Sequence, residues 1–348
     1  MKKFLSIALA LLMVCVMLPV VALAAEKTAS TYEELKSAIS TANDGDTIKL
    51  LADIDLSQTI TVNKTITLNM NGKKLYNTSD LWDKPAAEDD NWSLISVRGS
   101  GNLTITGNGT FAAKENDCYA VDVQESGATV TIENGTFIGN IHAVYVYTGT
   151  ANVKGGTYSV QQKFPDPAKG DEFVLNCYDA NRANGTARIN VTGGTFKNFN
   201  PADNKAEGEG NNFADNSLVV QKNNTVQNND YYVGNAANEV IAAASKGEEI
   251  LVLNGTTLTN VPAGVIIQNG TDGEITVNGE KIGPNEGGDS GYVVPAPTTI
   301  VIITPSEDTT PKTDDQKNPS TGANDFVGLA AAAAVVALLG SAVVLRKK

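Results

Sequence analysis

Few side chains of this chain have the chemistry of a catalyst. His142 is the single histidine, and the arginines ahead of the C-terminal tail are Arg98, Arg182 and Arg188. A general base is within the chemistry of imidazole, but a lone histidine among apolar residues is more often a hydrogen-bonded structural residue. No arginine is placed beside an acidic cluster by the sequence pattern. The basic residues therefore predict no catalytic centre.

Paired carboxylates are also missing from the predicted strands. Glycoside hydrolysis needs two carboxyl groups that face each other, and lyase chemistry needs a carboxylate cluster that holds calcium beside a basic residue. Asp122 lies on a predicted strand, but the equivalent residue of the next repeat is Tyr145, and Asp179 falls in a different register. The pattern therefore favours a protein that is not an enzyme and needs no cofactor.

Two acidic loops are candidates for calcium. Asp44 and Asp46 lie in the loop Asn-Asp-Gly-Asp, and Glu88, Asp89 and Asp90 follow one another in a second loop. Closely spaced carboxylate oxygens are the ligands that calcium prefers. The alternative is a solvated turn, because Asn, Asp and Gly are also the residues that make bends.

Both tryptophans lie in one predicted insertion. Trp82 and Trp92 flank a polar segment that interrupts the early repeats. Exposed aromatic rings on a rigid scaffold can stack on sugar rings, so this loop is a candidate ligand-binding loop. The alternative, which we favour, is that the rings pack the loop against the scaffold.

A short motif recurs along the middle of the chain. Its pattern is any residue, then Asn or Gly, Gly, Thr and an aromatic residue, and its copies end at Phe111, Phe137, Tyr158 and Phe196. An alternating strand precedes each copy, and Asn and Gly tolerate the left-handed backbone of a sharp bend. The copies are 21 to 38 residues apart, which is typical of solenoid repeats.

Coils of this length with short strands and no helix suit a right-handed parallel β-helix. In such a fold the four aromatic residues would form one stack inside the solenoid. The chain resembles the pectate-lyase-like β-helix domains of bacterial surface proteins over roughly residues 28 to 283. The resemblance implies an all-β fold, in which a parallel β-helix occupies residues 26–230.

The cysteines that follow the N-terminal leader are expected to be free thiols. Cys118 and Cys177 each precede an aromatic residue of the motif, Phe137 and Phe196, by nineteen residues. Equal spacing predicts that they share one interior ladder with Ile141 between them. Two rungs separate them by roughly 10 Å, which exceeds the reach of a disulfide.

Two helical segments are predicted to cap the β-helix. Thr31 to Glu34 form a capping box that begins an amphipathic helix over the first coil. A second helix is predicted at residues 238–246, followed like the first by a strand and an Asn-Gly turn. We therefore expect residues 231–283 to repeat the opening unit, either as a second module or as a closing cap.

The chain changes composition after residue 283. Residues 284–317 are rich in Pro, Thr and Asp, which predicts an extended, disordered stalk. Residues 318–348 combine a pentapeptide, an apolar run at 326–345 and a basic end. Twenty apolar residues are long enough for a transmembrane helix, and the basic end favours the cytoplasmic side.

The pentapeptide resembles the LPXTG-type sorting signal of Gram-positive bacteria. Its residues are Asn318, Pro319, Ser320, Thr321 and Gly322. The resemblance implies cleavage by a sortase after Thr321 and linkage of that threonine to peptidoglycan. Asn318 departs from the usual leucine and leaves the sortase class open. The alternative is a plain membrane anchor.

The N-terminus and the overall charge agree with display outside the cell. Residues 1–25 have two lysines, an apolar stretch and small residues before the expected cleavage site, as in a secretory signal peptide. The formal net charge is −13, which disfavours nucleic acid and anionic lipid as partners. Membrane contact is therefore expected through residues 326–345 alone.

These observations predict a secreted protein anchored to the cell wall of a Gram-positive bacterium. We expect an adhesin or structural surface protein that contacts glycans or the proteins of a host or neighbouring cell. The alternative is a divergent polysaccharide lyase or glycoside hydrolase, since β-helices also host such enzymes.

Overall fold

The computed structural model describes residues 24–81, 93–115, 118–162, 172–203, 212–222, 229–285 and 290–297. These residues belong to one compact unit that ends at Pro297. Residues 1–23 of the predicted signal peptide, most of the predicted stalk, the sorting signal and the apolar run lie outside them. Within the described part, no helix is long and apolar enough to cross a membrane.

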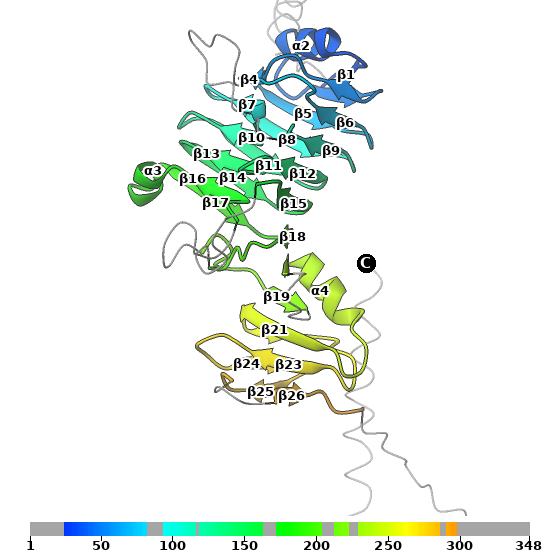
Figure 1. Cartoon of the computed structure of the whole chain (residues 1–348), viewed down its shortest axis with the longest axis vertical. Helices are drawn as coiled ribbons and strands as arrows, with labels where there is room; N and C mark the ends of the chain where they lie inside the picture. The colour runs from blue at the N-terminus through cyan, green and yellow to red at the C-terminus, as the bar shows by residue number, and fades with distance from the viewer. Residues whose placement is uncertain are drawn as a thin grey trace, which may run out of the picture. The chain divides into compact units, whose positions relative to one another are not determined.

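The fold is a solenoid of stacked parallel strands (Figure 1). One sheet has the spatial order β1 (Glu26–Ala29), β2 (Thr47–Leu50), β5 (Thr65–Asn69), β8 (Asn102–Thr106), β11 (Thr129–Ile132), β14 (Gly149–Val153) and β17 (Ala187–Val191). A second sheet contains β4 (Ile60–Val62), β7 (Ser93–Val97), β10 (Tyr119–Val123), β13 (Val144–Val146) and β16 (Leu175–Cys177). A third begins with β3 (Ile54–Asp55), β6 (Lys74–Tyr76), β9 (Thr110–Ala112), β12 (Thr136–Gly139), β15 (Thr157–Val160) and β18 (Gly194–Lys197).

The aromatic residues of the repeated motif form the predicted interior stack. Phe111, Phe137, Tyr158 and Phe196 are aligned by the register of β9, β12, β15 and β18, and all are fully buried. Adjacent ring centroids are 4.8, 5.1 and 5.0 Å apart, with interplanar angles of 9° to 11°. Parallel pairing with identical register therefore places one flat ring directly over the next.

Glycine in the motif is required by the close approach of successive coils. Gly156 has φ 101°, which disfavours any side chain. At Gly155 a Cβ atom would lie 2.4 Å from the carbonyl oxygen of Glu133 in the preceding coil. The Gly-Gly pair thus lets the corner between the first and third sheets stack without a gap.

The predicted N-terminal cap is present as α2 (Tyr32–Ser40). The Glu34 backbone N–H donates to Thr31 Oγ1 at 3.2 Å, and the Glu34 carboxylate accepts the backbone N–H of Ser30 at 2.8 Å. Leu35 and Ile39 are buried beneath this helix. The helix therefore covers the apolar end of the first coil, as the amphipathic pattern predicts.

Both described cysteines are free and buried, as predicted, but they do not share a ladder. The paired residues of β10 and β13 begin with Val121 and Val144, and the Cys118 backbone oxygen accepts the N–H of Asn140 at 2.8 Å. Ile141 is half-buried and not an interior residue as predicted. Cys177 instead pairs with Val146. The prediction of equivalent positions was wrong because α3 (Asp179–Ala183) lengthens the connection from β16 to β17, so counting nineteen residues back from Phe196 stops short of the position equivalent to Cys118.

Parallel stacking ends earlier than residue 230. After β18 the third sheet continues through β20 (Asp230–Val233), β19 (Val219–Lys222), β21 (Glu249–Asn254), β23 (Ile266–Asn269) and β26 (Tyr292–Val293). β18 pairs with β20 in antiparallel fashion, and so do β20 with β19 and β19 with β21. The direction of the chain therefore reverses before the second unit begins.

The second unit has a hydrophobic core of its own. Its helix α4 (Asn235–Ala242) begins three residues before the predicted start and buries Ala237 and Ile241. Parallel pairing resumes between β21 and β23, and between β22 (Thr257–Leu258) and β24 (Ile275–Val277). β25 (Glu280–Ile282) completes the short sheet by antiparallel pairing with β24. Buried side chains of these elements form a cluster separate from the first core.

The folded unit also extends past the predicted boundary at residue 283. β26 pairs with β23 in antiparallel fashion, and Val294 is buried in the second core. Val293 and Val294, which lie in the segment predicted to be a stalk, therefore belong to the folded unit.

Candidate functional site

Asp122 lies on β10 with its carboxylate buried among polar side chains. Gln124 Nε2 donates to Asp122 Oδ2 at 2.9 Å, and Arg98 Nε donates to Ser96 Oγ at 3.0 Å on the neighbouring strand. Asp122 Oδ1 and Ser93 Oγ are both buried without a hydrogen-bond partner among the described residues. Burial raises the pKa of Asp122 to about 6, although Ser96, Gln124, Arg98 and Ser93 favour the charged form.

Asp122 has no carboxylate partner on the adjacent coils. The register pairs it with Ser96 of β7 on one side and with Tyr145 of β13 on the other, as the repeat alignment predicts. Asp122 is fully buried, so a substrate bound at the surface would not reach it. Its environment is therefore that of a buried structural carboxylate rather than one of a catalytic pair.

His142 is held in a structural environment as well. Its Nδ1 lies 2.7 Å from the backbone oxygen of Phe173, and its Nε2 lies 3.4 Å from Asn176 Nδ2. The ring stacks on Tyr145 with centroids 5.2 Å apart. Burial lowers the pKa of His142 to about 4, so the ring is neutral at pH 7.

The carboxylates of the first acidic loop bind backbone groups. Asp46 is buried, and it accepts the N–H groups of Ala25 at 2.8 Å and Asn43 at 3.0 Å. These hydrogen bonds lower the pKa of Asp46. Asp44 Oδ1 accepts the N–H of Thr65 at 2.9 Å. The two carboxylates thus tie the turn to its own Asn43 and to the neighbouring segments at Ala25 and Thr65, in line with the alternative to calcium binding.

Several predicted site residues lie outside the described part of the chain. They are Trp82, Trp92, Glu88, Asp89, Asp90, Asn318, Pro319, Ser320, Thr321 and Gly322. Among the residues that the structure does describe, no group of three or more His, Cys, Asp or Glu side chains is arranged to hold a metal ion.

An exposed pair of tyrosines lies where the second sheet turns into the first. Tyr147 follows β13 and Tyr178 follows β16, and their exposed fractions are 42% and 44%. The two ring centroids are 4.9 Å apart at an interplanar angle of 35°. Because Val146 pairs with Cys177, the next residue of each coil occupies the same corner. The pair therefore presents adjoining aromatic faces to solvent.

The backbone beneath this tyrosine pair is tied down by α3. Asn181 Nδ2 donates to the backbone oxygen of Tyr147 at 2.6 Å, and Tyr178 N–H donates to that of Val146 at 2.9 Å. Thr148 Oγ1 donates to the Thr186 backbone oxygen at 3.1 Å, where the chain returns from α3. The rings thus stand on a backbone held by several hydrogen bonds, which reduces the entropy lost on binding.

Sequence reasoning missed the tyrosine pair. The sequence did contain a signal for this pair, because an apolar residue is followed by tyrosine at Val146-Tyr147 and again at Cys177-Tyr178. The distance of nineteen residues from Phe196 aligned Cys177 with Cys118. Tyr178 was therefore not aligned with Tyr147. Recognition of the α3 insertion would have brought the two tyrosines together.

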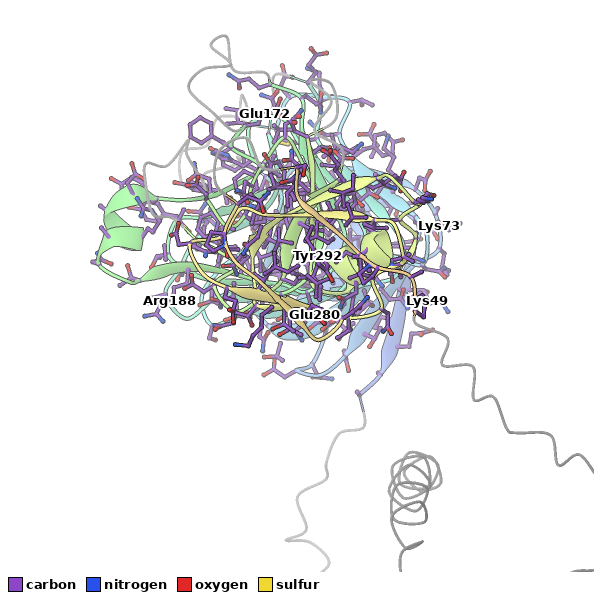
Figure 2. All side chains as sticks on the ribbon, turned by 90° about the horizontal axis from the view of Figure 1, so that it is seen from below. Lys49, Lys73, Glu172, Arg188, Glu280 and Tyr292 are labelled. Carbon is purple, nitrogen blue, oxygen red and sulfur yellow. The ribbon has the colours of Figure 1, made fainter. Side chains whose placement is uncertain are left out.

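The tyrosine pair adjoins the polar outer face of the first sheet. One column of this face contains Thr47, Thr67, Thr104, Thr131, Asn152 and Asn190. Asn190 Nδ2 donates to Asn152 Oδ1 at 3.0 Å, which links neighbouring coils. The charged side chains Lys49 and Arg188, also on this sheet, lie on the outside of the stack (Figure 2).

Arg188 and Arg182 line a cavity of about 340 Å³ next to α3, together with Asn190 and Asn212. Arg188 Nε donates to the backbone oxygen of Gly185 at 3.0 Å. Neither tyrosine lines this cavity, but α3 begins directly after Tyr178 and carries Arg182. Aromatic rings can stack on a sugar ring, and amide and guanidinium groups can hydrogen-bond to its hydroxyl groups.

Comparison of this chain with protein-family models, with curated proteins and with solved structures finds no match.

Proposed function

We propose that this chain is a non-catalytic adhesin of a Gram-positive cell surface, which binds glycans through its solenoid. The observation that carries the proposal is the exposed pair Tyr147 and Tyr178 at one corner of the stack. Adjoining exposed apolar faces, unlike single exposed residues, are a feature of binding surfaces. The rest of the outer face, rich in Thr and Asn, supplies additional hydrogen-bonding groups.

The fold that presents this corner is proposed to be a right-handed parallel β-helix. Two features support that proposal: identical register between successive coils, and parallel connections within each sheet. Connections between parallel strands of one sheet are right-handed in nearly all proteins. In this proposal α2 closes the N-terminal end and the second unit continues from the other end.

We expect loss of both rings to weaken glycan retention by on the order of tenfold or more, since truncated tyrosines at binding hot spots cost about 2 kcal/mol. The test passes the full chain and its Tyr147→Ala/Tyr178→Ala variant over immobilised plant, mucin and bacterial polysaccharides. Tyr76→Ala is the matched control, because Tyr76 is a half-buried tyrosine on another sheet.

Retained protein and released oligosaccharide are measured together in this screen. Retention of the wild-type chain without release, lost in the double variant, supports the adhesin. Release of unsaturated or reducing ends would favour the lyase or hydrolase. Retention that is unchanged in the double variant would contradict binding at the tyrosine pair and would place the glycan site on another part of this chain.

The proposed location is the cell wall, with sortase and peptidoglycan as partners through Thr321. The leader at residues 1–25 and the pentapeptide, apolar run and basic end of residues 318–348 support this location. The proposed attachment would display the solenoid outside the membrane on the segment that follows residue 297.

We expect Thr321→Ala to prevent linkage to the wall in a Gram-positive host. The variant should be recovered from the membrane or medium, and most of the wild-type chain from wall digested with muramidase. Ser320→Ala is the control, since that position varies in the motif the pentapeptide resembles. Wall-linked material in equal amounts from both variants would contradict attachment at Thr321.

A further inference from the structure

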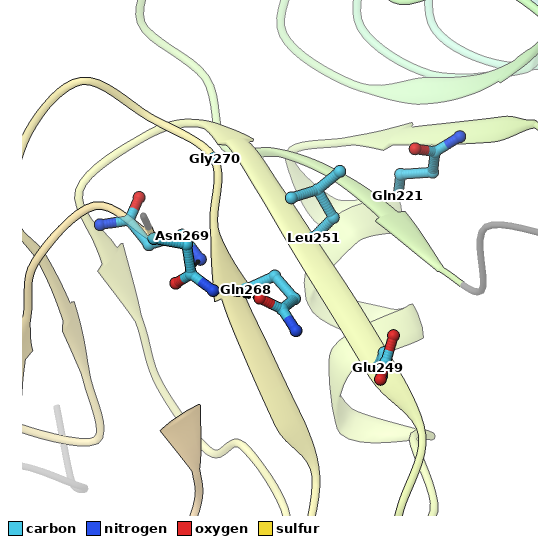
Figure 3. Close-up of a pocket in the computed structure, with 7 residues that line it drawn as sticks. Gln221, Glu249, Leu251, Gln268, Asn269 and Gly270 are labelled. Carbon is cyan, nitrogen blue, oxygen red and sulfur yellow. Dashed lines mark hydrogen bonds between the residues drawn. The ribbon is translucent and has the colours of Figure 1, made fainter. Parts of the chain in front are cut away.

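A second candidate site lies on the sheet formed by β19, β21 and β23 (Figure 3). The residues that line this cavity of about 280 Å³ are Gln221, Glu249, Leu251, Gln268, Asn269, Gly270 and Asn285. We call it the amide pocket. Its floor follows one column across three strands, because Gln221 of β19 pairs with Leu251 of β21, and Leu251 pairs with Gln268 of β23.

One wall of the amide pocket is fixed by a hydrogen-bond network. Asn269 is 1% exposed, and its Nδ2 donates to the backbone oxygens of Gly273 at 2.9 Å and Ile282 at 3.1 Å. Asn285 Oδ1 accepts the Asn269 backbone N–H at 3.0 Å, and Asn285 Nδ2 donates to Gln268 Oε1. Gln268 is therefore oriented before any ligand arrives.

The network leaves a defined set of groups open to a ligand. Because Gln268 Oε1 accepts from Asn285, the Nε2 group of Gln268 remains as a donor. Gln221 is 5% exposed and its Nε2 donates to Asn229 Oδ1 at 3.3 Å, which leaves Oε1 as an acceptor. The Glu249 carboxylate is an exposed acceptor at the other end of the pocket. Leu251 supplies an aliphatic patch between the two glutamines.

This arrangement selects a ligand by its chemistry. A hydroxyl group can accept from Gln268 and donate to Gln221 or Glu249, so vicinal hydroxyls match the pocket better than a ligand that only accepts or only donates. Glu249 repels anions, and the amides disfavour a purely apolar group. An apolar ring face with hydroxyl groups at its edge is the chemistry of a neutral pyranose.

We propose that the amide pocket is a second, independent binding site for a neutral hexose unit of a glycan. The site uses amides and an aliphatic side chain, whereas the corner of Tyr147 and Tyr178 uses aromatic rings. Two weak sites on one displayed chain would raise the apparent affinity for a polysaccharide that spans both, or for a surface with many chains.

The test detects weak binding of methyl glycosides of glucose, galactose and mannose by saturation-transfer difference NMR. The full chain is used in the Tyr147→Ala/Tyr178→Ala background, which removes the other proposed site. We expect a signal that is retained in this background and reduced at least tenfold by Gln268→Met. That substitution keeps the length of the side chain but removes its donor. Gln58→Leu, on an exposed loop at the N-terminal end, is the control.

Glu249→Gln provides a second variant at an exposed position with little effect on folding, and we expect it to weaken the signal as well. Absence of any glycoside signal in the tyrosine-deficient background would overturn the proposal, and so would a signal unchanged by both pocket variants. Neither result bears on the tyrosine corner, whose failure shows separately in polysaccharide retention by the wild-type chain.

Discussion

Replacing Phe137 with alanine is expected to lower the free energy of unfolding by about 3 to 5 kcal/mol. Phe137 is fully buried and stacks between Phe111 and Tyr158, with ring centroids 4.8 and 5.1 Å away. Its removal leaves a ring-sized cavity in the middle of the ladder. Neighbouring coils are held in register by backbone pairing on both sides, so they cannot collapse to fill it.

The measurement is equilibrium unfolding in urea followed by circular dichroism. Tyr147→Ala is the control for loss of an exposed ring, and we expect it to change stability by less than about 1 kcal/mol. Phe137→Leu keeps most of the volume and reports the same trend if the alanine variant does not fold. A cost below about 1 kcal/mol for Phe137→Ala would contradict a central role of the aromatic ladder.

Replacing Asp122 with asparagine is expected to stabilise the protein at pH 7 by about 3 kcal/mol and to have little effect near pH 4. The pKa of Asp122 is about 6 in the folded state, against 3.8 for the ordinary side chain. Between these pH values the folded chain binds a proton that the unfolded chain releases, so stability falls as the pH rises. Asparagine has no charge to bury, and its amide can donate to the buried Ser93 hydroxyl.

His142 changes the free energy of unfolding with pH in the opposite direction, over nearly the same pH range. Its folded pKa of about 4 lies below the ordinary 6.5, so the unfolded chain binds more protons, and stability rises with pH between these values. In the wild-type chain the pH dependences of stability that Asp122 and His142 cause largely cancel. We therefore expect Asp122→Asn to expose a loss of stability of about 3 kcal/mol on acidification from pH 7 to pH 4.

Unfolding curves of the wild type and of Asp122→Asn at half-unit steps from pH 4 to pH 7 test this expectation. Ser96→Ala, at the equivalent position of the neighbouring strand, removes a group that favours the charged form of Asp122 but keeps the carboxylate, so the fall of stability with rising pH that Asp122 causes should remain in this control. A difference between the wild type and Asp122→Asn that does not grow with pH would mean that Asp122 does not carry a buried charge at pH 7.

The repeated motif alone predicted the solenoid and its interior ladder. That prediction was possible because a sharp corner and an inward apolar side chain recur once per coil, whatever the rest of the coil contains. Where the side chain is not aromatic, as at Ile54 and Leu75, the coil could not be found from the motif. The N-terminal helix could also be predicted from the capping box at Thr31, because residues that are neighbours in sequence decide where a helix begins.

Chain direction and register depended on tertiary structure. Asn71-Gly72 and Asn278-Gly279 look equivalent in sequence, and all four residues have positive φ. The first is a corner between two sheets, whereas the second joins β24 and β25 as an antiparallel hairpin. A local turn signal specifies the bend but not the strand that the chain pairs with afterwards.

By itself the sequence determined the class of fold, the coil interior, the N-terminal cap and the absence of a carboxylate pair at Asp122. Only the tertiary structure brought Tyr147 beside Tyr178 and aligned Gln221, Leu251 and Gln268 across three strands. The physical reason is that cross-strand neighbours are set by the lengths of the intervening loops. α3 and the antiparallel strands after β18 change those lengths without any periodic signal.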